Sequence, residues 1–354
     1  MSTTIPRRLL LGAVLAIPVL LATACGGSSD SGASSASSGA SGSSAAVTDV
    51  KLLSYSGTSI SWIGYVAQQK GFFKDNHLDV TTTALPSGQQ ATATLLGGSV
   101  DITILDPGNA GPLLTQGQDL QLLVNGVTNY WTLVGKKGAS ADDLKAEMAS
   151  LKGTSITAPS TAGSGGRMTR ILAGAYGLSD SDVTLVADPT DATLTSGTSA
   201  AAMTDTIGAC RLNALGYPSV MNFTDPPAKT STYPKSVQSL VGLAGLGYWT
   251  TPSWAKAHPE AVTEFQKAIT QTIAWMKDSA NTSELASLMR SSDYNVAALD
   301  DTQWNDCVKT IATTYDPDFS KQDAKEWSSI LTSIDKIPAL PDTSKWFAKG
   351  LPQG

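Results

Sequence analysis

Short apolar runs alternate with amphipathic segments along the chain from residue 50 onward. Runs such as VKLLSY and VDITIL have the length and residue types of strands, whereas the segments between them carry apolar residues at helical spacing. The first unit predicts strand, helix, strand, helix and buried strand at residues 50–55, 62–71, 78–85, 89–98 and 100–105. This alternation predicts parallel β-α-β units with helices on both faces of a sheet.

A second unit of the same kind begins near residue 141. Its pattern predicts helix, strand, helix, strand and the start of a further helix at residues 141–153, 154–159, 167–177, 182–187 and 188–194. From Pro252 onward the pattern is nearly all helical, and residues 259–277 form the clearest amphipathic segment. We therefore expect an α/β protein with two units in sequence, followed by C-terminal helices.

The two units carry a faint internal repeat. Residues 93–106 and 192–205 share Ala-Thr-Leu, one glycine and a final aspartate. Each predicts a helix, a glycine turn and a strand, with the acid at the end of the strand. Because open α/β sheets bind ligands beyond the carboxyl ends of their strands, Asp106 and Asp205 would face a cleft between two lobes. A chance match in Ala- and Thr-rich sequence is the alternative.

The N-terminal segment has the layout of an export signal. Arg7 and Arg8 precede an apolar run at residues 9–24, which is shorter than the roughly 20 apolar residues of a membrane span. The residues before Cys25 resemble the lipobox of bacterial lipoproteins. We expect residues 1–24 to be a lipoprotein signal peptide, exported by the Sec or the twin-arginine route, and Cys25 to be lipidated. An ordinary signal with an incidental cysteine is the alternative.

Residues 25–47 are almost wholly Gly, Ser and Ala after the cysteine. This composition predicts a flexible linker, because it offers too little apolar surface to offset the entropy of ordering. The folded part would then be tethered to the outer face of the cell membrane, outside the cytoplasm.

The charge balance argues against a nucleic-acid partner. Without a signal segment that carries two arginines and no acids, 22 basic and 30 acidic residues remain, a formal net charge of −8. Phosphate binding requires clustered Lys and Arg. Roughly 300 residues from Val47 onward are too many for one small core and are typical of two lobes.

The cysteines and histidines restrict the chemistry. Beyond the anchor only Cys210 and Cys307 remain; we expect two buried free thiols, with a disulfide as the alternative in a compartment that permits one. The two histidines, His77 and His258, lie in segments typical of surface turns. We therefore expect no His-based catalysis, no metal and no cofactor.

The stretch GYVAQQKGFFKDNHLDVTTTALPSGQQATATLLGGSVDITIL at 64–105 is similar to the first lobe of solute-binding proteins of ABC importers for sulfonates, taurine, nitrate and thiamine-pyrimidine precursors. The matching residues are Ala67, Lys70, Gly71, Phe72, Phe73, Leu78, Val80, Gly88, Leu96, Gly98, Val100 and Asp101. The resemblance continues through residues 154–186 and 247–269, so it covers most of the chain after the linker. Two departures are the absence of an acid after Gly197 and the presence of Arg167.

The resemblance implies a type II periplasmic-binding fold with two lobes and two hinge crossings. The first lobe would comprise residues 48–132 and 250–354, and the second lobe 133–249. Such a protein, expected to be a monomer, would capture a small solute by hinge closure and deliver it to an ABC permease in the cytoplasmic membrane. We place the crossings near Tyr130–Gly135 and Leu246–Thr251.

Several residues are candidates for contact with a ligand. The loop after the strand at 154–159 opens a helix with Arg167 in its first turn, which favours an anion. In the first lobe, two further helix starts offer donors, and Trp62 is able to stack on a flat solute. The candidates are Ser56, Thr58, Ser59, Trp62, Ser87, Gly88, Gln89, Asp106, Asn109, Ser160, Thr161, Gly163, Ser164, Gly165, Arg167, Asp205 and Tyr248. Helix capping by the polar residues, with the aromatic residues in the core or at the hinge, is the alternative.

The sign of the ligand's charge stays open at this stage. Arg167 and the helix starts favour a sulfonate or nitrate-like oxyanion, whereas Asp106 and Asp205 favour a pyrimidine or an amine-bearing solute. Asp106 precedes Pro107, as an N-cap residue does. A further functional class is a sensor that binds a ligand and reports its presence to a membrane partner. The thiamine-pyrimidine synthase that shares this family shape needs a Cys-rich motif and metal-binding His, which this sequence lacks, so we expect no enzyme.

Overall fold

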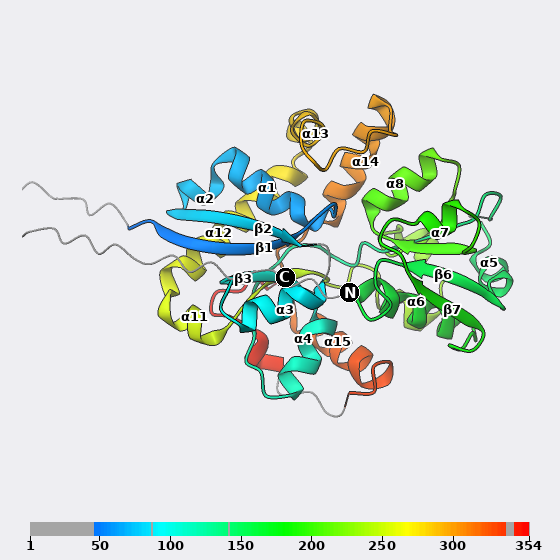
Figure 1. Cartoon of the computed structure of the whole chain (residues 1–354), viewed down its shortest axis with the longest axis horizontal. Helices are drawn as coiled ribbons and strands as arrows, with labels where there is room; N and C mark the ends of the chain where they lie inside the picture. The colour runs from blue at the N-terminus through cyan, green and yellow to red at the C-terminus, as the bar shows by residue number, and fades with distance from the viewer. Residues whose placement is uncertain (1–45, 86–87, 141, 338–342, 354) are drawn as a thin grey trace, which may run out of the picture. The chain divides into compact units, whose positions relative to one another are not determined.

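The computed structural model describes residues 46–85, 88–140, 142–337 and 343–353 (Figure 1). The expected signal peptide, the lipidated Cys25 and Ser87 lie outside the described residues. The first five-stranded sheet has the order β2-β1-β3-β10-β4. Its strands are β1 (Thr48–Tyr55), β2 (Leu78–Leu85), β3 (Ile102–Leu105), β4 (Gln121–Asn125) and β10 (Gly247–Thr250), and its connecting helices are α1 (Ile60–Lys70), α2 (Phe72–Asp75), α3 (Gly88–Leu96) and α4 (Pro107–Thr115).

The second five-stranded sheet has the order β7-β6-β8-β5-β9. Its strands are β5 (Thr132–Gly135), β6 (Thr154–Ala158), β7 (Val183–Ala187), β8 (Ala201–Thr204) and β9 (Ser219–Asn222). Its helices are α5 (Leu144–Ser150), α6 (Ser164–Ala175), α7 (Ala192–Thr195), α8 (Thr206–Ala214), α9 (Pro227–Thr230) and α10 (Lys235–Gln238).

The two sheets repeat one arrangement. In each, the first strand of the unit pairs in parallel with the second and third, β1 with β2 and β3, and β6 with β7 and β8. An antiparallel strand, β10 or β5, then follows the central strand β3 or β8. The expected α/β class with two units is thereby confirmed, and the faint repeat corresponds to equivalent positions in the two sheets.

The C-terminal helices are α11 (Pro252–Ala257), α12 (Pro259–Lys277), α13 (Thr282–Arg290), α14 (Asp301–Thr314) and α15 (Lys321–Ser333), with short 3-10 turns at Ser279–Asn281 and Thr343–Trp346. Helix α12 packs against α1 and α2, and its buried stripe places Phe265 in stacked contact with Phe73, 5.8 Å between ring centroids. We call the first sheet with α1–α4 and α11–α15 the first lobe, and the second sheet with α5–α10 the second lobe.

Two segments cross between the lobes, 126–131 and 239–246, and they pair with each other. The amide of Gly245 donates to the carbonyl of Val127 at 2.7 Å, and that of Asn129 donates to Leu243 at 2.6 Å. The residues at which we expected crossings include β5 and β10, which are inner strands of the two sheets, each beside the central strand. Both crossings therefore precede the antiparallel strands that the sequence pattern did not distinguish from linkers.

Cys210 and Cys307 form a disulfide, so the expectation of two free thiols was wrong. The two cysteines lie on α8 and α14, which pack against each other and bring the Cα atoms to 5.9 Å. The two cysteines lie 97 residues apart in the chain, so their pairing depends on how α8 and α14 pack and not on a local sequence pattern. Within the described ranges, no helix combines the length and apolarity of a membrane span.

Candidate functional site

Asp106 and Asp205 occupy equivalent places at the carboxyl ends of the central strands. Each caps the helix that follows: Asp106 accepts a hydrogen bond from the amide of Asn109 at 2.9 Å, and Asp205 accepts one from Gly208 at 2.8 Å. Capping and a position between the lobes therefore coexist at both acids, because the N-terminus of each helix points away from its own sheet toward the other lobe.

Arg167 of the second lobe reaches the first lobe. Its guanidinium lies 3.4 Å from Asp106 Oδ1 and 2.6 Å from Asp335 Oδ2, and it donates to the carbonyl of Gly108 at 3.1 Å. The arginine is only 4% exposed. In this structure the one cation that we expected to meet an anionic solute is instead neutralised by two carboxylates of the opposite lobe.

Asp205 of the second lobe also contacts the first lobe. Its Oδ2 accepts a long hydrogen bond from the amide of Ser59, 3.4 Å, at the start of α1 in the first lobe. Tyr315 holds that turn by donating to the carbonyl of Ser59 at 2.9 Å. The hydroxyl of Ser59 is buried and has no partner among the described residues. A helix start that is favourable for an anion is thus occupied by a carboxylate of the protein itself.

Burial dominates the electrostatics of both acids. It raises the pKa of Asp106, and the guanidinium of Arg167 opposes that rise. Burial likewise raises the pKa of Asp205 to about 6, against the hydrogen bonds from Gly208 and Ser59. The buried Tyr130 has its pKa raised by burial first and then by Asp205 and Asp106, so this tyrosine lies near both carboxylates.

The loop before α6 is held by its own contacts. Ser160 Oγ accepts from the amide of Gly163 at 3.2 Å, and Ser164 Oγ accepts from the indole of Trp131 at 2.8 Å. A Cβ on Gly165 would lie 2.8 Å from the Trp131 ring. The backbone carbonyl of Thr161 accepts from the guanidinium of Arg170 at 2.7 Å. The loop therefore packs on the crossing and on its own helix.

The first-lobe candidates separate into surface and core. Ser56 is exposed, and Thr58 shares a hydrogen bond with the hydroxyl of Ser61 at 3.1 Å. Trp62 is fully buried and packs on Trp304, with ring centroids 5.8 Å apart. The structure thus places Trp62 in the core of the first lobe.

The remaining candidates divide in the same way. Gly88 begins α3, and Gln89 lies in its first turn. Asn109 is half-buried beside Asp106. Tyr248 is fully buried and meets Phe265 edge-on at 5.3 Å between centroids, as a core residue of β10 does.

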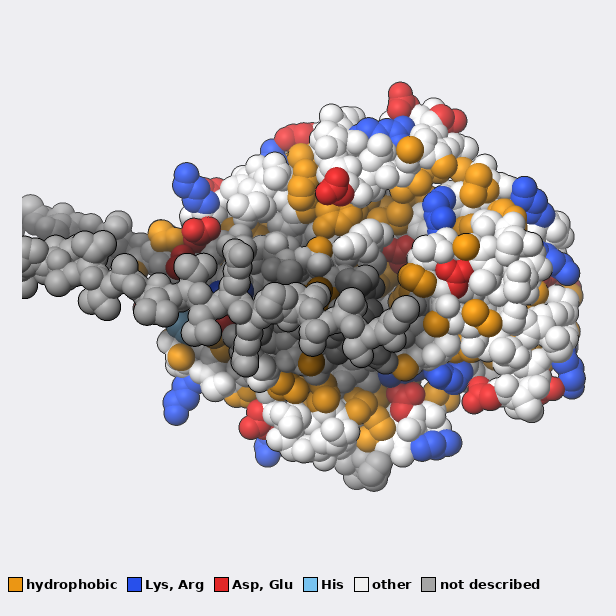
Figure 2. All heavy atoms as spheres, in the orientation of Figure 1, with side chains coloured by type: hydrophobic (Ala, Val, Ile, Leu, Met, Phe, Trp, Pro, Cys, Tyr) orange, Lys and Arg blue, Asp and Glu red, His pale blue; other side chains and the backbone are white. Residues whose placement is uncertain are grey.

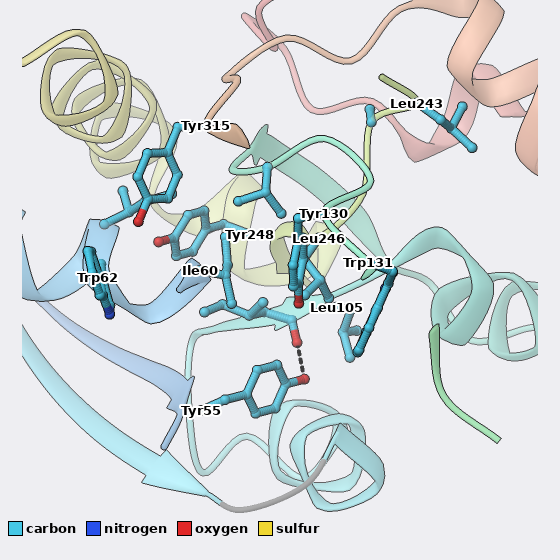
Figure 3. Packing of buried hydrophobic residues seen from close by; sticks show 14 of the residues in the cluster. Tyr55, Ile60, Trp62, Leu105, Tyr130, Trp131, Leu243, Leu246, Tyr248 and Tyr315 are labelled. Carbon is cyan, nitrogen blue, oxygen red and sulfur yellow. Dashed lines mark hydrogen bonds between the residues drawn. The ribbon is translucent and has the colours of Figure 1, made fainter. Parts of the chain in front are cut away.

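Aromatic and apolar side chains pack closely between the lobes beside the crossings (Figure 3). Figure 3 shows Tyr55, Tyr130, Trp131 and Leu246 converging near the crossings, and Tyr130 stacks on Trp131 at 5.3 Å between centroids. A cavity beside the crossings measures about 10 Å³ and is lined by Thr128, Asn129, Tyr130, Trp131, Ser164, Met168, Gly245, Leu246 and Trp327. It is no larger than one water molecule. In this structure, the protein's own charged groups make the contacts between the lobes.

A larger groove of about 1100 Å³ lies elsewhere, on α11, α12 and the C-terminal segment. None of the sequence-predicted site residues lines it. On the face shown in Figure 2, acidic and basic side chains are interspersed, without a broad basic patch among the described residues. Nor do three metal-ligating side chains gather within those residues.

Sequence reasoning missed two contributors to the cleft. Asp335 lies just beyond α15 and makes the shortest contact of Arg167, and Tyr315 orients the start of α1. An acid at the end of a C-terminal helix carries no motif, so only the packing of α15 against α4 brings Asp335 into reach.

The comparisons agree with this architecture. The family model described as NMT1/THI5 like matches residues 61–282. The alkanesulfonate-binding protein SsuA from Xanthomonas axonopodis pv. citri is similar at 15% identity and a TM-score of 0.64, covering 84% of this chain and 96% of that chain. SsuA from Escherichia coli is similar at 13% identity and 0.63, covering 86% and 98%. The nitrate-binding protein NrtA from Synechocystis PCC 6803 gives 15% and 0.57, covering 71% and 68%. No curated relative matches the sequence. These likenesses confirm the expected fold of periplasmic binding proteins.

Proposed function

The chain belongs to the NMT1/THI5-like family, and from this membership we propose that it is the solute-binding component of an ABC importer. The observation that carries the proposal is the set of charged contacts between the lobes, at the carboxyl ends of both central strands. The solute would bind where Arg167 and Asp205 now lie. Binding of this kind requires no catalysis, and we assign the protein no enzymatic role.

Closure and solute compete for the same groups. In this structure, Asp106 is paired with Arg167 and Asp205 with the amide of Ser59. A solute stabilises closure only if it interacts better with the closed lobes than with the open ones. It must therefore offer partners that replace these internal contacts when the lobes close around it by bending at the crossings 126–131 and 239–246.

The charges favour a solute with N–H donors or a positive charge. Two carboxylates, Asp106 and Asp335, contact Arg167, whose three nitrogen atoms are thereby already engaged, and a third carboxylate, Asp205, meets only a backbone amide of the other lobe. Asp106 Oδ2 is buried and has no hydrogen-bond partner among the described residues. An amine or an aminopyrimidine would pair with such a carboxylate.

An oxyanion is the second candidate class. The SsuA and NrtA proteins with this fold are named for alkanesulfonate and nitrate, and the amide of Ser59 at the start of α1 is a suitable donor for an anion. In this case Arg167 would leave its carboxylates and contact the solute.

A thermal-shift panel of alkylamines, aminopyrimidines, alkanesulfonates and nitrate tests the ligand class. We expect an amine-bearing solute to raise the melting temperature, and Asp106→Asn to weaken its binding roughly 10-fold to 150-fold. Asp300→Asn is the matched control, because Asp300 also caps a helix, α14, but lies away from the cleft.

A shift with oxyanions alone would reverse the assignment of charge. No shift or calorimetric heat with any class of solute would argue against the binding function itself.

We further propose a lipid anchor at Cys25 after removal of residues 1–24, a linker over 25–47, and delivery of the solute by a monomer to a permease at the outer face of the cytoplasmic membrane. The lipobox-like residues before Cys25 support the anchor. Wild-type protein should partition with membranes and incorporate labelled fatty acid, whereas Cys25→Ser should do neither. Equal labelling of both would refute the anchor without affecting the solute-binding proposal.

A further inference from the structure

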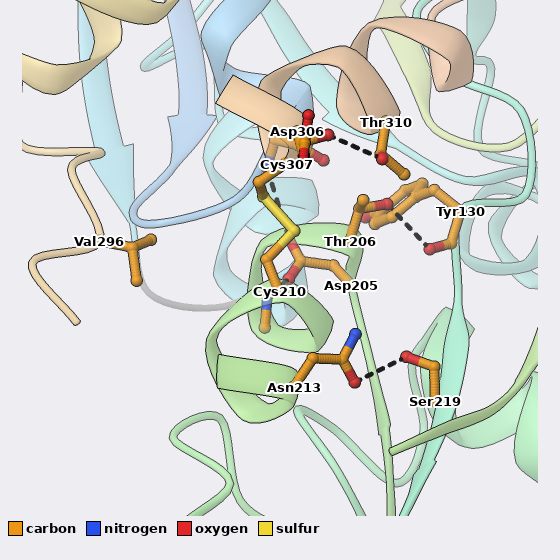
Figure 4. The surroundings of a disulfide bond; sticks show 12 residues. Tyr130, Asp205, Thr206, Cys210, Asn213, Ser219, Val296, Asp306, Cys307 and Thr310 are labelled. Carbon is orange, nitrogen blue, oxygen red and sulfur yellow. Dashed lines mark hydrogen bonds between the residues drawn. A yellow bond between two sulfur atoms is a disulfide. The ribbon is translucent and has the colours of Figure 1, made fainter. Parts of the chain in front are cut away.

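The disulfide Cys210–Cys307 joins the two lobes directly. Cys210 lies on α8 of the second lobe, and Cys307 lies on α14 of the first. Figure 4 shows the sulfur bridge beside Asp205, on the side of the cleft where that carboxylate meets the first lobe. Among the described residues, it is the only covalent link between the lobes besides the two crossings.

Both cysteines lie on firmly held helices. Three residues before Cys307, Trp304 is buried against Trp62 and donates its indole N–H to the carbonyl of Ala286 at 2.9 Å. Next to Cys210, Arg211 pairs with Asp191 at 2.8 Å, inside the second lobe. The bridge therefore connects two rigid elements and transmits any displacement of one lobe to the other.

The bridge is also distant from the hinge. The C-terminal end of α14 meets the first crossing, where Tyr315 pairs with Val127. Cys307 precedes Tyr315 by eight residues, which corresponds to about 12 Å along a helix axis. A covalent link at such a distance from the bending segments limits how far α8 and α14 separate.

The opposite side of the cleft has no such link. There the lobes are joined through Arg167 of α6, which contacts Asp106 at the start of α4 and Asp335 beyond α15. Figure 1 shows α8 and α14 at the top of the view, and α4, α6 and α15 below. The Asp335 side chain is 21% exposed, against 1% for Asp106, so these contacts reach the solvent.

From these observations, we propose that the disulfide holds the lobes together on the α8–α14 side, so that the cleft opens on the side of Arg167. This inference rests on the proposed solute-binding function. Solute then reaches the cleft past the guanidinium of Arg167, which must leave Asp106 and Asp335 as the lobes part. Arg167 is therefore the first charged group that an entering solute meets, whichever class of solute the closed cleft retains.

Distances between spin labels test this without any solute. Labels carried by unnatural amino acids at the exposed residues Leu215 and Lys309 report on the α8–α14 side, and labels at Ala162 and Ser333 report on the α6–α15 side. In the oxidised protein, we expect one narrow distance for the first pair and a second, longer distance for the other pair. Asp335→Asn should increase the population of that longer distance only on the α6–α15 side.

Removing the bridge provides the converse test. In the Cys210→Ala/Cys307→Ala variant, or after reduction of the wild type, a longer distance should also emerge between Leu215 and Lys309. Near-UV circular dichroism verifies that the lobes remain folded; if they do not, the comparison of the wild type with Asp335→Asn in the oxidised state still decides. Equal lengthening on both sides of the oxidised protein, or an unchanged α8–α14 distance in the folded bridge-free protein, would overturn the inference. Either outcome leaves the solute-binding proposal to the thermal-shift panel.

Discussion

Asp106 and Asp205 are structural equivalents with different partners. Each follows the central strand of its sheet and caps the next helix. Across the cleft, Asp106 meets a guanidinium at 3.4 Å, whereas Asp205 meets only a backbone amide at 3.4 Å. The repeated strand order determines where the carboxylates lie. Their partners, Arg167 and the amide of Ser59, come from segments that do not correspond to each other in the two lobes. The two acids therefore differ in the charge that they face and in how strongly they hold the lobes together.

The largest effect is expected when the ion pair between Asp106 and Arg167 is removed. Arg167→Ala leaves Asp106 buried without its counter-ion, which typically costs about 3–5 kcal/mol of folding stability. The double variant Arg167→Ala/Asp106→Asn should recover much of this loss, because it removes the uncompensated carboxylate. Urea unfolding of the single and double variants measures both effects.

Arg170→Ala is the matched control on the same helix. Its guanidinium donates to a carbonyl of its own lobe, so we expect a loss of about 1 kcal/mol. If the Arg167 and Arg170 variants lose equal stability, the ion pair with Asp106 contributes nothing specific, and the contrast between the two acids disappears.

The positions of the acids were predictable, and their partners were not. Strand-then-aspartate is a local pattern, and N-cap chemistry requires only neighbouring residues, so Asp106 and Asp205 were located from sequence. Arg167 contacts residues 61 and 168 positions away. Hydrophobic periodicity does not specify such contacts, since they depend on how the lobes meet. Trp62 illustrates the same limit, because helical spacing fits both a core residue and a ligand-facing one.

The second prediction uses pH to isolate Asp205. Its pKa is raised from 3.8 to about 6, so the folded protein binds more protons than the unfolded chain between these values. This contribution to stability is present below about pH 4 and is lost as the pH rises through 6. The shift corresponds to at most about 3 kcal/mol, and the partial exposure of Asp205 lowers that figure.

Asp205→Asn should remove this pH dependence while keeping a capping side chain. Relative to wild type, the variant should be more stable at pH 8 than at pH 4. Unfolding free energies of both proteins across this range provide the measurement, and Asp106 titrates in both of them. Parallel profiles for the two proteins would show that folding does not raise the pKa of Asp205.

The third prediction compares two glycines near the starts of the capped helices. A Cβ at Gly108 would meet the guanidinium of Arg167, whereas a Cβ at Gly208 would meet Thr204 of its own lobe. Each alanine substitution should cost about 1–3 kcal/mol through overpacking. Only Gly108→Ala should also lengthen the distance between labels at Ala162 and Ser333. Lengthening by Gly208→Ala as well would mean that general destabilisation opens the cleft.

The smallest effect on stability is expected at Ser59, where Asp205 meets the first lobe. The Ser59 hydroxyl is fully buried and lacks a partner among the described residues, while its amide and carbonyl make the contacts with Asp205 and Tyr315. Ser59→Ala keeps both backbone contacts and removes an unsatisfied polar atom. Stability should therefore change by less than about 0.5 kcal/mol or rise slightly.

The same substitution distinguishes a packing defect from a ligand group. A hydroxyl that becomes hydrogen-bonded only when solute is present contributes to affinity and not to folding, so Ser59→Ala should weaken solute binding roughly 2-fold to 10-fold. Thr58→Val is the neighbouring control, because the Thr58 hydroxyl already pairs with Ser61. The contrary outcome is that Ser59→Ala loses as much stability as removal of a paired hydroxyl and leaves solute affinity unchanged. The Ser59 hydroxyl would then stabilise the fold and would not bind solute, and Asp205 would be the only one of these two side chains that contacts a solute.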